Sequence, residues 1–145
     1  MRRRMVTWLT LAVLAALIGF AVYVRVATSD PGRWHTPPVA EGAWGEVTRK
    51  MGSASLRLDL TAGDPVDLLS RLDAIALASP RTTRLAGSVA EGRITWITRS
   101  ALWSFPDYTT AEARSDGLYL YARQRFGSDD LGVNAARLRD WLSRL

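Results

Sequence analysis

The residues best suited to chemistry are arginines, carboxylates and one asparagine in the last third of the chain. The candidate ligand-binding set consists of Arg99, Asp107, Arg123, Arg125, Asp129, Asn134 and Arg137. A guanidinium group binds carboxylate or phosphate oxygens through two parallel hydrogen bonds, so these arginines predict a site for a carboxylate, a phosphate or a lipid headgroup. Structural ion pairs that fix a loop to a helix would use the same residue types, and both interpretations stay open.

Groupings that could catalyse a reaction are scarce. The chain has no cysteine and a single histidine, His35, in a proline-rich stretch. A lone histidine without clustered carboxylates is not a metal site, and a linker fixes a catalytic group poorly. The sequence therefore predicts no metal, no cofactor and no catalytic residue. An enzyme that uses Asp107 or Asp129 as a base and the arginines as oxyanion partners stays open; a pocket holding one carboxylate of raised pKa would favour it.

Two segments resemble the signature of the DUF1499 family, which occurs in bacteria and plastids. They are Arg99-Ser100 with Phe105-Pro106-Asp107, and Gly127 to Asn134 with Arg137 behind it. The resemblance covers roughly Ser53 to Leu145. Many members also carry a Pro-Asn-Cys-Val segment near the start of the domain, which this cysteine-free chain lacks. The resemblance implies a shared fold and supplies no activity.

The composition of the N-terminal region predicts a membrane-spanning segment. Met5 to Val24 carries no charge, and as a helix this run of about 20 residues spans roughly 30 Å, the thickness of a bilayer core. A cleaved signal peptide would have a shorter apolar region and a small-x-small cleavage site. The uninterrupted run favours an uncleaved single-pass anchor within residues 1–26.

The charges around this segment predict its orientation. Arg2, Arg3 and Arg4 precede it, whereas the other side has a mixed flank. The positive-inside rule then places the N-terminus in the cytoplasm. We therefore expect a bacterial inner-membrane protein whose C-terminal domain lies in the periplasm. From Pro31 onward the two signs are interspersed, so the sequence lacks the basic face of a nucleic-acid binder.

The remainder divides into a Pro/Gly-rich tether, residues 27–52, and an α+β domain, residues 53–145. Within the tether, residues 45–51 are expected to form a helical turn. Alternating apolar residues and Gly-containing turns predict strands, and a period of 3.6 predicts helices. The expected strands are residues 53–60, 82–89, 93–99, 108–114 and 117–124. The first expected helix is residues 64–78, with Asp64 as its N-cap. The second is capped by Ser128 or Asp129 and runs to the C-terminus. The order predicts a two-layer sandwich, a mainly antiparallel sheet of about five strands with both helices on one face.

Three functions are compatible with an anchored α+β domain of this composition. The favoured one is a non-enzymatic, membrane-anchored binding or accessory module for a small molecule, lipid or protein. The second is an envelope assembly factor that contacts a partner through the arginines of its C-terminal helix, Arg139 and Arg144. The third is the enzyme described above.

Overall fold

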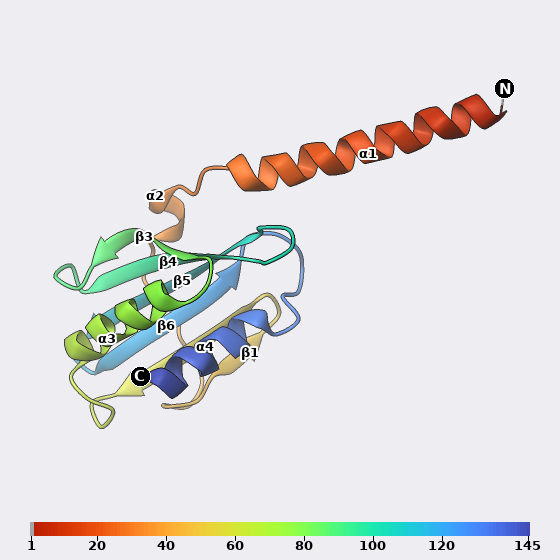
Figure 1. Ribbon diagram of the computed structural model, residues 1–145. Helices are drawn as coiled ribbons and strands as arrows, with labels where there is room; N and C mark the ends of the chain where they lie inside the picture. Colours follow the sequence, from red (N-terminus) through yellow and green to blue (C-terminus); the bar gives the residue numbers. More distant parts are fainter. Residues whose placement is uncertain (1) are drawn as a thin grey trace.

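A computed structural model describes residues 2–145 and has an α+β architecture (Figure 1). Six antiparallel strands form one sheet in the order β1-β2-β6-β5-β4-β3. The helices are α1 (Arg2–Val26), α2 (Pro31–Trp34), α3 (Pro65–Ala78) and α4 (Val133–Arg144). The strands are β1 (Thr48–Lys50), β2 (Ser53–Asp59), β3 (Thr82–Ser88), β4 (Arg93–Arg99), β5 (Pro106–Arg114) and β6 (Gly117–Gln124).

The core lies between the sheet and the helices α3 and α4, which cover one face (Figure 1). Alternation along the strands directs apolar side chains toward these helices, as Leu56 and Leu58 of β2 and Leu120 of β6 illustrate. Trp96 of β4 meets Trp141 of α4 edge-on, with ring centroids 5.7 Å apart. The predicted two-layer arrangement is confirmed.

The sheet has six strands where about five were predicted. The additional strand, β1, lies where residues 45–51 were expected to form a helical turn, and that expectation was wrong. Thr48, Arg49 and Lys50 pair with Ser55, Ala54 and Ser53 of β2. The turn between them places Gly52 at φ 69°, a conformation that favours glycine. A three-residue edge strand is too short to show a recognisable alternation of apolar and polar residues in the sequence.

The two core helices begin differently. Asp64 caps α3 as predicted, because its carboxylate accepts hydrogen bonds from the backbone N–H groups of Val66 and Asp67. Helix α4 starts at Val133, later than a cap at Ser128 or Asp129 implied. Leu131 and Gly132 both have positive φ, which keeps the chain out of the helix until Val133. Asp130, instead, accepts from the N–H groups of Gly132 and Asn134.

Helix α1 is long and apolar enough to cross a membrane, with a mean hydropathy of 2.3 over its most apolar window. A signal sequence has the same properties, so length and composition fit both an anchor and a signal. The C-terminal end of α1 packs on the domain. Val24 is fully buried, and its carbonyl oxygen accepts a hydrogen bond from Arg99. Phe20 contacts the rings of Phe105 and Phe126, with centroids 6.1 and 6.3 Å away.

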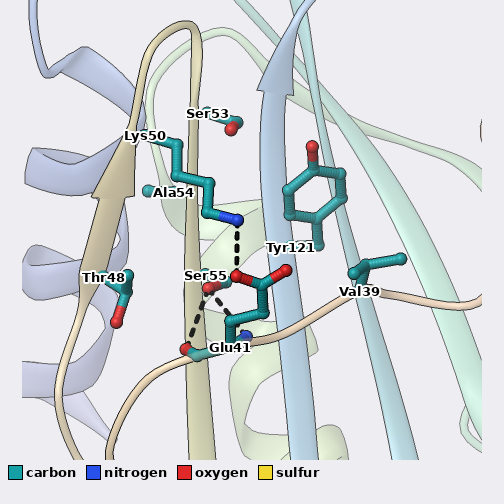
Figure 2. Close-up of a pocket in the computed structure, with 8 residues that line it drawn as sticks. All are labelled: Val39, Glu41, Thr48, Lys50, Ser53, Ala54, Ser55 and Tyr121. Atoms are coloured by element: carbon teal, nitrogen blue, oxygen red, sulfur yellow. Dashed lines mark hydrogen bonds and ion pairs between the residues drawn. The ribbon is translucent and has the colours of Figure 1, made fainter.

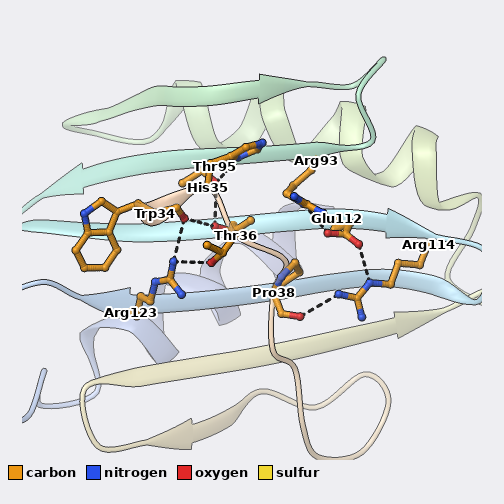
Figure 3. A network of polar contacts seen from close by, with 10 residues as sticks. Trp34, His35, Thr36, Pro38, Arg93, Thr95, Glu112, Arg114 and Arg123 are labelled. Carbon is orange, nitrogen blue, oxygen red and sulfur yellow. Dashed lines mark hydrogen bonds and ion pairs between the residues drawn. The ribbon is translucent and has the colours of Figure 1, made fainter. Parts of the chain in front are cut away.

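Residues 28–45 cross the sheet face opposite to α3 and α4. Figure 3 shows residues 34–38 lying over β4, β5 and β6, with the two helices behind the sheet. Trp34 stacks on the buried Tyr108 ring at 3.9 Å between centroids and 11° between planes. Arg114 donates to the carbonyl oxygen of Pro38. Most of the stretch predicted as a tether therefore packs on the sheet, with the short helix α2 followed by an irregular segment that contains Pro37 and Pro38.

Candidate functional site

The predicted site residues separate into two groups because side chains alternate between the two faces of a strand. Arg123 of β6 and Arg125, which follows the strand, contact the segment 28–45 that crosses the opposite face. Asp107, Asn134 and Arg137 lie on the helix-covered side. The sequence therefore named residues from both faces as one cluster, and the structure does not bring all seven together.

On the crossed face, Arg123 holds the chain segment in place. Its guanidinium donates to the carbonyl oxygen of Trp34 at 2.9 Å and to the hydroxyl of Thr36 at 3.1 Å (Figure 3). It also lies 5.2 Å from the centroid of the Trp34 ring. Burial lowers the pKa of Arg123. Within residues 2–145 no carboxylate forms an ion pair with it. These contacts assign Arg123 a structural role.

His35 lies on the same face in a chain of hydroxyl groups. Its Nδ1 is 2.8 Å from the Thr95 hydroxyl, which is 2.9 Å from the hydroxyl of Thr110. Burial, and next the charge of Arg93, lowers the pKa of His35, so the neutral ring is favoured. No group of three His, Cys, Asp or Glu side chains within residues 2–145 could hold a metal ion. His35 packs the crossing segment onto the sheet.

A small hollow lies beside the edge strand β1, between Glu41, Lys50, Ser55 and Tyr121 (Figure 2). Lys50, the only lysine in the chain, forms an ion pair with Glu41 at 2.5 Å. The hydroxyl of Ser55 bonds the backbone of Glu41. The hollow measures about 50 Å³, which admits water and no larger ligand. Its polar groups satisfy one another, so we assign it no chemistry.

The helix-covered side holds a buried ion pair at the end of the sheet. Arg137 of α4 donates to Asp107 of β5 at 3.2 Å and to the side-chain oxygen of Asn134 at 2.6 Å. The Arg137 and Asp107 side chains are 11% and 15% exposed. Burial raises the pKa of Asp107 above its ordinary value, although the Arg137 guanidinium opposes this shift. Both residues were predicted as site residues, and neither is free of a partner.

Two hollows flank this ion pair. We call the first the basic hollow; it measures about 380 Å³ and lies between α4 and the β3–β4 edge. Residues that line it include Arg81, Thr98, Arg99, Ser100, Arg137 and Trp141. We call the second the acidic hollow; it measures about 290 Å³. Residues that line it include Ser100, Phe105, Asp107, Phe126, Asp129 and Asp130.

Two arginines of the basic hollow have no carboxylate partner within residues 2–145, and the one carboxylate in its lining, Asp140, is paired with Arg144. Arg81 donates to the carbonyl oxygen of Arg99, and Arg99 donates to the carbonyl oxygens of Val24 and Ser104. Within residues 2–145 neither arginine forms an ion pair with a carboxylate. A carbonyl oxygen satisfies a hydrogen bond but carries no net charge to cancel that of a guanidinium. Two arginines without a carboxylate partner and one paired carboxylate, Asp140, therefore line a hollow whose size suits a small ligand.

The remaining predicted residues contribute less to this site. Arg125 donates to the carbonyl oxygen of Thr28 and the hydroxyl of Tyr108, so it joins the end of α1 to the sheet. Asp129 pairs with Arg49 of β1 at 3.2 Å. Sequence reasoning missed Arg81, which follows Pro80 in the turn before β3. Its position beside Arg99 depends on the pairing of β3 with β4, in which Thr82 lies opposite Thr98.

Comparison with known proteins gives one result. Residues 45–145 match the sequence model of DUF1499, described as a protein of unknown function. The searches of curated proteins and of solved structures returned no match. The matched range contains both motifs and both hollows, and it begins in the loop before β1.

Proposed function

We propose that this chain, which belongs to the DUF1499 family, is a membrane-anchored, non-enzymatic binding module that takes an anionic group into the basic hollow. The observation that carries the proposal is the pair of arginines, Arg81 and Arg99, which donate to carbonyl oxygens and form no ion pair with a carboxylate within residues 2–145. Each guanidinium keeps donors suited to two oxygens of one phosphate or carboxylate. The Ser100 hydroxyl, which accepts from the backbone N–H of Phe105, keeps its own proton as a further donor along the same lining.

The ligand class is a small molecule or a lipid with a phosphate or carboxylate group. Trp141 and Val133 give the basic hollow an apolar wall beside its charges. A ligand with an anionic head and an apolar body would satisfy both surfaces. The hollow also adjoins Arg99, which bonds the end of α1. A lipid from the membrane around α1 would therefore reach the hollow without leaving the interface.

Localisation at the bacterial inner membrane, with the domain in the periplasm, is part of this proposal. Three arginines at the start of α1, before its uncharged run, support retention of the N-terminus in the cytoplasm. The docking of Val24 and Phe20 on the domain supports an uncleaved helix, because cleavage would remove packed side chains. An alkaline phosphatase fused after Leu145 is expected to be active in bacterial cells. An active cytoplasmic reporter with a silent phosphatase would contradict this orientation.

Native mass spectrometry of the full chain, released from membranes in mild detergent, tests the binding function. We expect a reproducible additional mass on the wild-type chain that is lost in Arg81→Ala and Arg99→Ala. The matched control is Arg71→Ala, because Arg71 is an exposed arginine of α3 outside both hollows. Circular dichroism shows whether each variant stays folded. A wild-type chain without additional mass, or equal loss in the Arg71→Ala control, would refute the proposal.

The enzyme hypothesis is a second candidate, and one observation favours it. Asp107 lines the acidic hollow and has a raised pKa, which is the property expected of a general acid or base at neutral pH. Its ion pair with Arg137 argues for a structural role instead, because the carboxylate is already engaged. The assembly-factor hypothesis loses one of its two arginines as a free surface group: Arg144 bonds Asp140 and Ser79.

A further inference from the structure

The most exposed large apolar side chains of the domain gather at one end of the sheet. Outside α1, the three highest exposures belong to Leu131, Met51 and Leu102, at 85%, 76% and 74%. Each lies in a separate loop, namely β6–α4, β1–β2 and β4–β5. Strand pairing places these loops at a common end, since Lys50 pairs with Ser53, Ser53 with Arg123, and Asp107 with Gln124. Solvent exposure of three such residues at one end needs an explanation.

The same end of the sheet lies against α1. In Figure 1 the β4–β5 and β6–α4 loops extend from this end on the side of α1, and the ring contacts confirm that they touch it. Phe105 and Phe126, from these two loops, pack on Phe20. Trp103 in turn stacks on Phe105 with centroids 6.4 Å apart. The loops therefore lie alongside the last turns of the helix.

The position of Phe20 fixes the depth of these loops in a membrane. Phe20 lies within the uncharged run and precedes Arg25 by five residues, or about 7.5 Å along the helix axis. If Arg25 is at the polar boundary, any ring in contact with Phe20 lies on the membrane side of that boundary. Phe105 and Phe126 then occupy the interface between headgroups and hydrocarbon, where aromatic rings are favoured.

Basic residues lie beside these apolar loops, and the two carboxylates that precede Leu131 are already engaged, Asp129 by Arg49 and Asp130 by backbone N–H groups. Arg81, Arg99 and Arg125 lie at the same end of the sheet and form no ion pair with a carboxylate within residues 2–145. Cationic side chains beside exposed apolar and aromatic ones match the chemistry of an anionic lipid surface, which offers phosphates above hydrocarbon. A protein partner would need no such relation to the depth of α1.

We infer that the end of the sheet bearing Met51, Leu102 and Leu131 is a membrane-docking surface, whose loops insert into the interface of the bilayer that α1 crosses. This inference rests on the anchoring role of α1 in the proposed function and is independent of the ligand in the basic hollow. Docking would hold the opening of that hollow at headgroup level. The domain would thus be attached to the membrane twice, by α1 and by its loops.

Site-specific labelling tests the inference, because the chain has no native cysteine. Leu102→Cys and Leu131→Cys would be labelled with an environment-sensitive fluorophore in the full chain, reconstituted in phosphatidylcholine–phosphatidylglycerol vesicles. Leu60→Cys is the matched control, an exposed leucine after β2 at the opposite end of the sheet. We expect blue-shifted emission and quenching by lipid-attached quenchers at 102 and 131, with water-like emission at 60.

Two results would overturn the inference. One is water-like emission at all three positions in vesicles. The other is shielding of positions 102 and 131 in native membranes alone, which would mean that a protein covers these loops. Near-ultraviolet circular dichroism verifies that each variant is folded. Because the labels report position and mass spectrometry reports a bound ligand, this inference and the proposed anion binding can fail separately.

Discussion

Asp107→Ala is expected to lower the free energy of unfolding by about 3–5 kcal/mol, the usual effect of removing one partner from a buried ion pair. The reason is the position of Arg137, whose side chain is largely buried and has Asp107 as its one carboxylate partner within residues 2–145. An arginine cannot lose its proton in this pH range, so the variant would bury an uncompensated charge. The remaining hydrogen bond to Asn134 does not neutralise it.

The stability lost in the reciprocal variant, Arg137→Ala, should depend on pH through the titration of Asp107, a group that Asp107→Ala removes. Burial already raises the pKa of Asp107 in the wild-type protein, and loss of Arg137 would raise it further. A folded-state pKa above the unfolded value means that the folded protein binds more protons between the two pKa values, so stability falls as pH rises through that window. Arg137→Ala should therefore cost less at acidic pH, where Asp107 is neutral.

Urea denaturation at several pH values measures both effects. Arg139→Ala is the control, since Arg139 lies on the exposed face of the same helix and should change stability by about 0.5 kcal/mol or less. The double variant Asp107→Ala/Arg137→Ala should cost less than the sum of the single changes, because no charge is left unpaired. Additive costs, or a single-variant cost as small as that of Arg139→Ala, would show that the pair does not stabilise the fold.

The fold was largely predictable because its signals are local. The alternation of Leu56 and Leu58, the Asp116-Gly117 turn and the Asp64 cap each act within a few residues, and each appears in the structure. The exceptions depend on contacts with distant residues. Strand β1 exists because it pairs with β2, and the delayed start of α4 depends on the left-handed conformations of Leu131 and Gly132.

The candidate site was predictable in composition and not in arrangement. Asp107 and Arg137 lie in different motifs, and only the packing of α4 on the sheet makes them partners. The alternation that identified β6 places Arg123 on the opposite face from the buried leucines of that strand. The sequence alone could therefore have assigned Arg123 and Asp107 to different faces of the sheet. Arg81 could not have been found, because its approach to Arg99 requires the pairing of β3 with β4.

The crossing segment leads to the second large expected effect. Trp34→Ala should lower the free energy of unfolding by about 3 kcal/mol, at the lower end of the range for loss of a large aromatic side chain because Trp34 is half-buried. The change removes the stacking on Tyr108 and the cation–π contact with Arg123. It also exposes the Tyr108 ring, which is fully buried in the wild-type protein.

The effect of Trp34→Ala should be concentrated in residues 27–42, and hydrogen–deuterium exchange measures this directly. We expect faster exchange in that segment, with strands β5 and β6 protected as before. Trp44→Ala is the matched control, because Trp44 packs edge-on against Tyr119 near the other end of the sheet. Unchanged exchange in residues 27–42 would show that Arg123 and His35 seat the segment without Trp34. Release of the segment would loosen the link between α1 and the domain, so the position of the domain relative to the membrane depends in part on the contact between Trp34 and Tyr108.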